Sequence, residues 1–156
     1  MESLNKIDRN ILRILQKDGR ISYSELARQV GLTTTPCIER VRRLEKAGII
    51  QDYVARLDAQ QLGVSLVVFV QIRLSRTAQD IFSEFSQAAA QLEQVQECYL
   101  VSGNFDYLIK ARVANMAAYR KFLGETLLTL PGVQESTSYV VMEQVKETQS
   151  IPIAKK

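Results

Sequence analysis

The spacing of hydrophobic residues changes from helical to mixed partway along this chain of 156 residues, and that change most constrains its fold. Residues 1–57 carry apolar side chains every three or four positions, which predicts helices. Residues 64–147 combine apolar runs and alternating stretches with helical patterns, which predicts strands and helices together. The polar residues 58–63 end in glycine and indicate a linker. Residues 148–156 predict a frayed tail.

Three short helices are predicted in the first segment. Apolar residues at helical spacing define the first of them: Leu4, Ile7, Ile11, Ile14 and Leu15. The second begins with a capping box, in which Ser22 is expected to accept from the Glu25 amide and Glu25 to reach back to the Ser22 amide. Thr33 is expected to cap the third helix. Residues 49–57 suggest one or two short strands, so the segment predicts a winged helix-turn-helix.

The third helix has an apolar side and a basic side. The apolar side would dock the helix on its own domain and contains Cys37, Ile38, Val41 and Leu44. At the start of the helix, Thr34 and Thr35 offer short hydroxyls to base edges. All of the chain's net charge of +3 lies in residues 1–60, which hold 11 basic and 8 acidic side chains. A DNA-reading helix is the favoured interpretation, and a solvated basic face on a structural bundle is the alternative.

Candidate DNA contacts come from the third helix, its cap and the helix before it. Arginines on the third helix would supply cations to phosphates. A symmetric dimer of such units should prefer two half-sites about one helical turn apart, or a multiple of that spacing. The candidate set is Ser24, Thr33, Thr34, Thr35, Glu39, Arg40, Arg42, Arg43 and Lys46.

The second segment predicts the order βαββαβ, which is a ferredoxin-like arrangement. The expected strands cover residues 64–74, 95–102, 106–113 and 137–145, and the expected helices cover 81–92 and 116–130. The continuous apolar first strand suggests a face or edge that a partner covers, so a dimer is expected. The fold class is therefore α+β, with a winged helix-turn-helix joined to a ferredoxin-like domain.

A glycine-containing turn between two strands is the candidate ligand site. Backbone N–H groups around Gly103 can bind a carboxylate, and Asp106 can pair with an ammonium group. The apolar residues Leu100, Tyr139 and Val141 could contact an aliphatic side chain. A free amino acid needs that combination. The alternative is a hairpin in which Asp106 simply caps its own turn.

The composition and the motifs argue against several classes of function. The chain has no histidine and two distant cysteines, Cys37 and Cys98, so it predicts no metal site, no His-based catalysis and no disulfide framework. No nucleophile–base constellation indicates an enzyme, and the aromatic segment typical of RNA-binding sheets is missing. The apolar run Leu66 to Val70 is too short to span a bilayer. Without a recognisable signal peptide at the start, a cytoplasmic protein without membrane contact is expected.

Longer stretches add a family resemblance. Thr33, Arg40-Val41, Leu44 and Gly48, with spacings of six, two and three residues, resemble the signature of Lrp/AsnC-type regulators. The stretches IDRNILRILQKDGRIS and TPCIERVRRLEKAG are similar to that family too. LGETLLTLPGV and YVVMEQVK match its leucine-responsive branch. The resemblance covers about residues 4–147.

The resemblance implies an amino-acid site between packed dimers, formed by the Gly-x-x-Asp turn and a facing strand. By match to the family pattern, the effector residues are Leu100, Ser102, Gly103, Asn104, Asp106, Met116, Tyr139, Val140 and Val141. We therefore expect a transcription regulator that takes leucine or methionine as effector, needs no other cofactor, and assembles into dimers and then into larger assemblies such as an octamer. An effector-independent architectural DNA-binding protein is the alternative.

Overall fold

The computed structural model describes residues 4–75 and 80–154, and the chain separates into two compact units. The first unit comprises Met1–Arg56 together with Lys146–Lys156, and the second comprises Leu57–Val145. The end of the chain thus belongs to the first unit, although the sequence suggested a separate tail.

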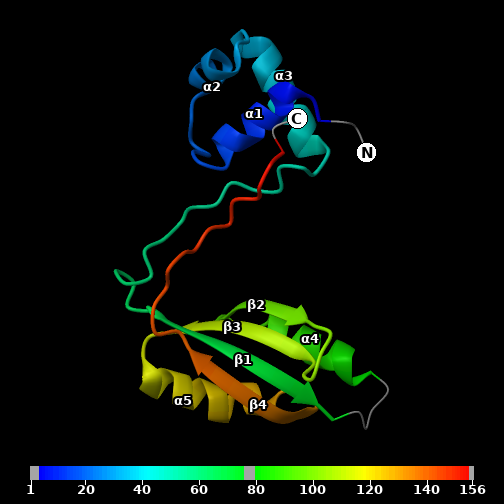
Figure 1. The fold of residues 1–156 in the computed structure, drawn as a ribbon, viewed down its shortest axis with the longest axis vertical. Helices are drawn as coiled ribbons and strands as arrows, with labels where there is room; N and C mark the ends of the chain where they lie inside the picture. Colours follow the sequence, from blue (N-terminus) through cyan, green and yellow to red (C-terminus); the bar gives the residue numbers. More distant parts are fainter. Residues whose placement is uncertain (1–3, 76–79, 155–156) are drawn as a thin grey trace. The chain divides into compact units, whose positions relative to one another are not determined.

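Three helices build the first unit, as predicted: α1 (Lys6–Leu15), α2 (Tyr23–Val30) and α3 (Thr34–Lys46) (Figure 1). Their apolar sides form one buried cluster because hydrophobic residues recur at helical spacing. The buried members are Ile11, Leu12, Leu26, Ala27, Cys37, Val41 and Leu44. This core fixes α3 against α1 and α2 and leaves its polar side outward.

The ends of these helices follow the predicted caps only in part. Ser22 accepts a hydrogen bond from the Glu25 amide at 3.2 Å, which confirms half of the capping box. The Glu25 carboxylate, expected to reach the Ser22 amide, instead pairs with Arg28 at 2.6 Å. Thr33 occupies the N-cap of α3 in an extended conformation, but its side chain makes no capping bond. Gly31 ends α2 with a φ of 72°, a conformation that favours glycine.

The short strands expected in residues 49–57 are not present, and that prediction was wrong. A strand needs a paired neighbour, and the described part of this unit contains no other strand. Tyr53 holds the segment in place instead. Its hydroxyl donates to Glu45 at 3.0 Å, and its ring lies close to the backbone at Gly19.

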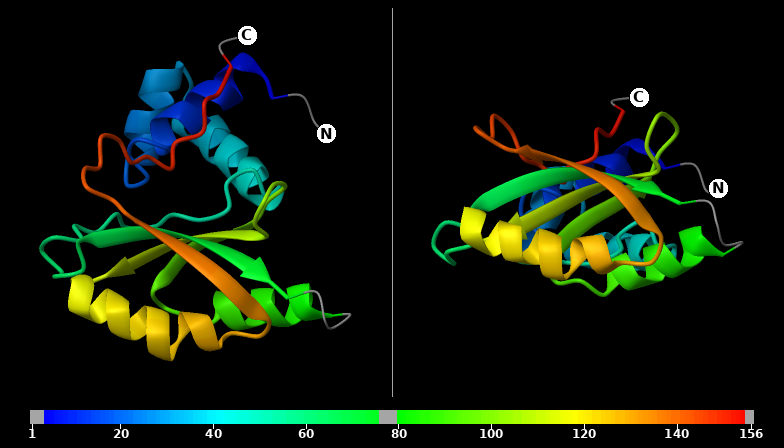
Figure 2. Two further views of the ribbon diagram at one scale, coloured as in Figure 1. Left: turned by 60° about the horizontal axis from the view of Figure 1, so that its bottom comes forward. Right: turned by 90° about the horizontal axis from the view of Figure 1, so that it is seen from below.

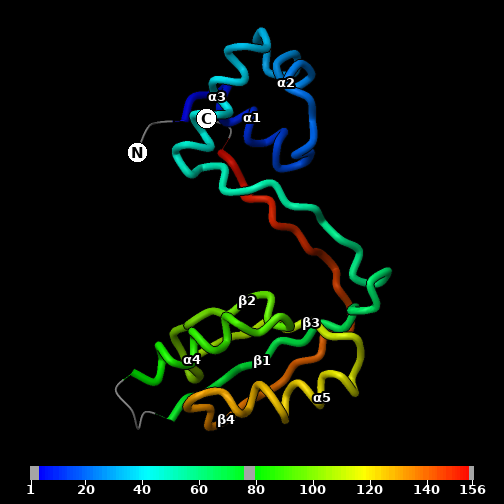
Figure 3. The backbone as a smooth tube through the Cα atoms, turned by 180° about the vertical axis from the view of Figure 1, so that it is seen from behind, coloured from blue at the N-terminus to red at the C-terminus, as the bar shows by residue number. Residues whose placement is uncertain are grey.

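The C-terminal segment also differs from its prediction, because it docks on α1 rather than fraying. Arg13 donates to the carbonyl oxygens of Ile153 and Ala154 at 3.2 and 2.6 Å. Gln16 exchanges two hydrogen bonds with the backbone of Ile151, at 2.6 and 3.2 Å. Ile153 packs on the cluster of the first unit, and Figure 3 shows the segment returning to the helices. Lys155 and Lys156 lie outside the described residues.

The second unit has the predicted βαββαβ order. Its elements are β1 (Leu66–Leu74), α4 (Ile81–Ala90), β2 (Val95–Leu100), β3 (Tyr107–Val113), α5 (Met116–Glu125), the short 3₁₀ helix η1 (Leu127–Thr129) and β4 (Val133–Val140). The strands form one antiparallel sheet in the order β2-β3-β1-β4. Both longer helices cover the same face of that sheet (Figure 2), so this part of the predicted fold class is confirmed.

The two faces of the sheet differ in composition. Alternate residues of β1 and β3, such as Val70 and Ile109, point to the helices and are fully buried. The opposite face contains Phe69 with Tyr139 directly across from it, and Tyr99 across from Leu108. Tyr139 is 51% exposed and Tyr99 52% exposed, so helices leave this face open.

The last strand begins and ends earlier than the expected residues 137–145. Its position follows from β1, because Val133 pairs with Leu74 and Val140 pairs with Val68. The Val141 amide still donates to the Val67 carbonyl at 3.0 Å; the chain then leaves the sheet, and Met142 is 94% exposed. The apolar character of residues 141–145 therefore misled the prediction.

Candidate functional sites

The polar side of α3 is the candidate nucleic-acid interface. The buried side chains Cys37, Val41 and Leu44 dock the helix on the core. Most of the candidate contacts lie on the opposite, exposed side: Thr33, Thr34, Thr35, Glu39, Arg42 and Lys46. In the part of the chain that the structure describes, Arg42 makes neither a hydrogen bond nor an ion pair, so its guanidinium can turn to a ligand.

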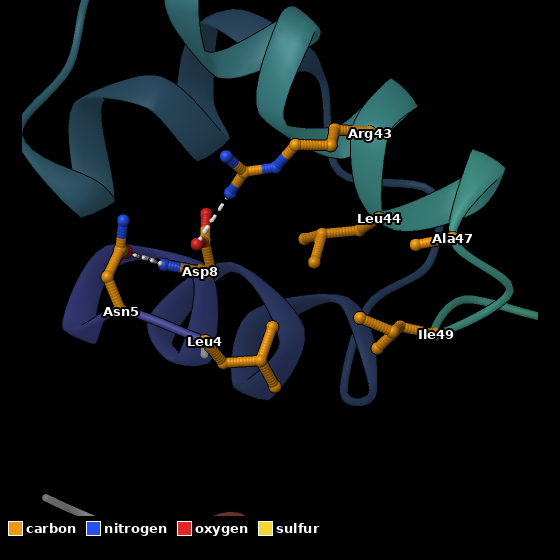
Figure 4. Close-up of a pocket in the computed structure, with 7 residues that line it drawn as sticks. All are labelled: Leu4, Asn5, Asp8, Arg43, Leu44, Ala47 and Ile49. Atoms are coloured by element: carbon orange, nitrogen blue, oxygen red, sulfur yellow. Dashed lines mark hydrogen bonds and ion pairs between the residues drawn. The ribbon is translucent and has the colours of Figure 1, made fainter. Parts of the chain in front are cut away.

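Two other candidate arginines of α3 form ion pairs with a buried carboxylate of α1. Arg40 donates to Oδ1 of Asp8 at 3.0 Å, and Arg43 donates to Oδ2 of the same carboxylate at 2.7 Å. Figure 4 shows the Arg43 side chain reaching from α3 to Asp8 on α1. Asp8 is 1% exposed. The sequence suggested free cations at both positions, but packing of α1 against α3 supplies them with a shared partner.

A small cavity of about 210 Å³ lies beside this ion pair, between the start of α1 and the end of α3 (Figure 4). Its lining is Leu4, Asn5, Asp8, Arg43, Leu44, Ala47 and Ile49. It is smaller than the roughly 300–1,000 Å³ of typical ligand pockets, and its carboxylate is already ion-paired. The cavity therefore offers no second site for chemistry.

Ser24, the remaining candidate contact, lies exposed on the first turn of α2. Its hydroxyl is 3.1 Å from that of Ser22, so the two share a hydrogen bond. On the same helix Arg28 donates to Glu25 and lowers the pKa of that carboxyl to about 2. The start of α2 is thus ordered by local bonds and keeps a hydroxyl at the surface.

Three hydrogen bonds order the Gly103 turn, and two of them fasten it to the end of β1. Within the turn, the Val101 amide donates to the Asp106 carbonyl at 2.9 Å. The Asp106 amide donates to Ile72, also at 2.9 Å, and the Leu74 amide donates to Oδ2 of Asp106 at 2.8 Å. This carboxylate bond is structural, but it reaches Leu74 of β1, whereas the hairpin alternative placed it within the turn itself. Gly103 adopts a φ of 149° that favours glycine.

A cavity of about 320 Å³ opens at this turn. The lining consists of Arg73, Leu74, Gly103, Asn104, Asp106 and Gln134. The Arg73 guanidinium forms part of the cavity lining and is bonded on two sides. Its Nη2 and Nε atoms donate to the Asn104 carbonyl at 2.6 and 3.2 Å. Its Nη1 atom lies 3.1 Å from the Glu135 carboxylate. The site thus combines a guanidinium, a carboxylate and a glycine turn, the groups that recognise a zwitterion.

Arg73 and Gln134 were missing from the sequence prediction. Arg73 interrupts an apolar strand, LVVFVQIRL, and that lone cation near a strand end was the available signal. Gln134 carries no comparable signal, because only pairing of β4 with β1 brings it to the turn.

The other predicted effector residues do not line this cavity within one chain. Leu100 and Ser102 lie near the turn and are exposed. Val140 lies across from Val68, whereas the cavity lies at the other end of β1, near Leu74. The positions away from the cavity are Met116, Tyr139, Val140 and Val141.

The described residues give no other reactive site. Residues 4–75 and 80–154 contain no cluster of three acidic, cysteine or histidine side chains that could hold a metal ion. Burial raises the pKa of both thiols, Cys37 and Cys98, which disfavours the reactive thiolate. None of the helices in the described ranges has the length and apolar composition needed to cross a bilayer.

A helix-turn-helix with an exposed polar side, in one chain with an α+β unit that holds a ligand-sized cavity, defines a class: DNA-binding regulators with their own ligand-binding domain. Comparison with known families gives the same two parts. Residues 4–51 match a winged helix-turn-helix DNA-binding model, and residues 67–151 match the Lrp/AsnC ligand binding domain. The chain therefore belongs to the Lrp/AsnC family of transcription regulators, which are not enzymes.

Individual relatives agree with that assignment. The chain is 59% identical over 152 residues to the leucine-responsive regulatory proteins of Klebsiella pneumoniae and Escherichia coli, covering 97% of this chain and 93% of each relative. Among solved structures, a transcriptional regulator from Neisseria meningitidis in complex with L-methionine is similar, with a TM-score of 0.92, 35% identity, and 96% and 97% coverage of the two chains. AsnC of Escherichia coli has a TM-score of 0.87 at 27% identity, with 96% and 99% coverage.

Proposed function

We propose that this regulator binds double-stranded DNA through the polar side of α3, and that leucine or methionine bound at the Gly103 turn changes that binding. The cavity at this turn is the observation that carries the proposal. Its volume of about 320 Å³ lies at the low end of the roughly 300–1,000 Å³ range of ligand pockets, which suits a single amino acid. Relatives named leucine-responsive and the structural neighbour holding L-methionine favour an aliphatic or thioether side chain.

The exposed polar residues of α3 are the proposed DNA contacts. Thr34 and Thr35, at the helix start, present hydroxyls to base edges, and Thr33 precedes them. Arg42 is the arginine on this side whose donors can pair with a guanine or a phosphate. Glu39 and Lys46 flank it, and Ser24 adds a hydroxyl from α2.

In the proposed effector site, the amides at Gly103 and Asn104 and the Arg73 guanidinium bind the ligand carboxylate. Asp106 binds the ammonium group while it retains its bond to Leu74. Because Met116 and residues 139–141 lie away from the cavity in one chain, we propose that they reach the ligand from another copy in the assembled protein. Leu100 and Ser102 border the turn.

A second copy of this chain is the proposed occupant of the open sheet face. Phe69, Leu108 and Tyr139 lie on that face, while both longer helices cover the other one. Burying these side chains between two sheets would stabilise a dimer. Dimers would then assemble further, for example to an octamer, so that several α3 helices engage DNA together. We place the working protein in the cytoplasm, where its DNA is accessible.

Isothermal titration calorimetry with leucine, methionine and asparagine tests the effector assignment. We expect binding of leucine or methionine and none of asparagine. A gel shift at fixed salt, with and without the bound amino acid, then tests whether DNA binding responds. If none of the twenty amino acids shifts the melting temperature or the gel pattern, the effector-independent architectural function replaces this proposal. Sedimentation of the wild type and of Phe69→Asp tests the dimer, which the charge should dissociate.

A further inference from the structure

Asp8 is a charged side chain in the core of the helix-turn-helix. It lies on the inner side of α1 and is 1% exposed, the one buried charged residue among residues 4–75 and 80–154. Buried carboxylates are costly unless they are paired and fully hydrogen-bonded. The Asp8 carboxylate therefore needs a cationic or hydrogen-bonding partner inside the fold. A neutral residue of similar shape at this position would need no cation.

The partners of Asp8 both come from α3, the proposed reading helix. Arg40 binds Oδ1 at 3.0 Å, and Arg43 binds Oδ2 at 2.7 Å. These arginines are three positions apart, so they extend from neighbouring turns of one helix side. The Asp8 amide is in turn bound by the Asn5 side chain at 2.9 Å, which anchors the carboxylate-bearing turn of α1 (Figure 4).

These bonds restrict how α3 can present its cations. The Arg40 side chain is 28% exposed and the Arg43 side chain 47% exposed, and each has one nitrogen held by α1. Arg42, between them in sequence, is exposed and has no ion-pair partner in the described residues. The Asp8 carboxylate therefore forms ion pairs with two of the three arginines of α3, Arg40 and Arg43, and leaves the third, Arg42, for DNA.

We infer that Asp8 is a positioning residue for DNA recognition, which sets the rotation of α3 on α1 through Arg40 and Arg43 and thereby makes Arg42 the base-reading arginine. This inference rests on the proposed function of α3. A purely structural role would affect only folding stability. A positioning role must also change how well the protein distinguishes one DNA sequence from another.

The test compares Asp8→Asn with Asp18→Asn in the full chain. Asp18 is an exposed residue of the same unit whose carboxylate accepts from the Arg20 amide at 2.9 Å. Both substitutions remove one negative charge, so both should strengthen nonspecific DNA binding slightly. The DNA probes are a duplex that the wild type selects from a random pool and a scrambled duplex of equal composition. Circular dichroism at the assay temperature establishes that each variant is folded.

We expect Asp8→Asn to lose about tenfold or more in affinity for the selected duplex, in the range typical of a lost base contact, but not for the scrambled duplex. Asp18→Asn should lose neither. Because the charge change alone favours binding, a specific loss in Asp8→Asn reports geometry. An unchanged ratio of selected to scrambled affinity in folded Asp8→Asn would overturn the inference.

Double substitutions test whether Asp8 acts through these arginines. If Asp8 orients α3 through Arg43 and so places Arg42, then Asp8→Asn combined with Arg43→Gln, or with Arg42→Gln, should bind the selected duplex no more weakly than the weaker of the two single variants. Multiplying losses for Arg43 would instead make it an independent DNA contact and overturn the assignment. If Asp8→Asn does not fold, Arg40→Lys with Arg43→Lys, which keeps both charges, replaces it and should show the same specific loss. A wild type that selects no sequence contradicts the proposed function itself.

Discussion

The Leu74 amide donates a hydrogen bond to Oδ2 of Asp106 at 2.8 Å, so the carboxylate proposed to bind a ligand also fastens the turn that carries it to β1. Asp106→Ala should therefore lose amino-acid binding and also destabilise the second unit by about 1–3 kcal/mol, since the Leu74 amide is left without its acceptor. Asp106→Asn keeps an acceptor for Leu74 but removes the charge, so it should lose ligand binding at nearly wild-type stability. Calorimetry and thermal melts measure both. Equal destabilisation in the two variants would contradict this separation of roles.

Arg73 donates two hydrogen bonds to the Asn104 carbonyl and contacts Glu135 at 3.1 Å. Arg73→Lys keeps the charge but loses the forked geometry, so we expect at least tenfold weaker binding of the effector. Glu135→Gln is the matched control. It removes only an exposed ion pair, which is worth about 0–1 kcal/mol, and should leave effector binding intact or stronger. Effector affinity unchanged by Arg73→Lys would remove Arg73 from the site.

Gly132 adopts a φ of 71°, and a Cβ atom placed there would lie 2.2 Å from Cγ1 of Ile81. Gly132→Ala should destabilise the second unit by roughly 2–6 kcal/mol, because backbone strain of about 1–3 kcal/mol adds to overpacking of similar size. Gly124, in α5, has no atom within 4 Å of the same position. Gly124→Ala should stabilise by about 0.5–1 kcal/mol. Urea denaturation of both variants gives the comparison, and similar effects in the two would be inconsistent with the crowding at Ile81.

The docked C-terminal segment should contribute to the stability of the first unit. A chain shortened after residue 150 loses the bonds of Arg13 and Gln16 to this segment, together with the packing of Ile153. Each of these four hydrogen bonds contributes roughly 0.5–1.5 kcal/mol, so we expect the first unit to lose about 2–6 kcal/mol. Hydrogen exchange of the α1 amides measures this directly. Exchange as slow as in the full chain would show that the segment does not stabilise α1.

Burial and the bond to Glu45 raise the pKa of Tyr53 to about 12. Because the folded pKa lies above that of a free tyrosine, about 10, the contribution of Tyr53 to stability is fully present below pH 10. It is lost as the pH rises towards 12. Ultraviolet titration of the phenolate should show this late component in the wild type and not in Tyr53→Phe. Glu45→Gln should move it to lower pH, and an unmoved titration would assign the shift to burial alone.

The helix α2 and the strand β4 differ in how well the sequence predicts their ends. Ser22 and Gly31 bound α2 where predicted, because caps and helix stops depend on a few neighbouring residues. The limits of β4 were misplaced, because they depend on Val133 and Val140 pairing with a strand far away in sequence. After Val140, only one more backbone hydrogen bond to β1 is seen among the described residues, from the Val141 amide to the Val67 carbonyl at 3.0 Å, so the apolar residues beyond it resemble a strand only locally.

The sequence by itself determined the helices of the first unit, the βαββαβ order of the second, and the turn around Gly103, because periodicity and glycine positions act over short distances. Tertiary packing decides which arginines of α3 remain unpaired and can contact DNA. Asp8 lies more than thirty positions before Arg40 and Arg43, and nothing in the local pattern pairs them. Arg73 reaches the turn in the same way, through strand pairing. Charges interact through space, so their partners follow from packing and cannot be read along the chain.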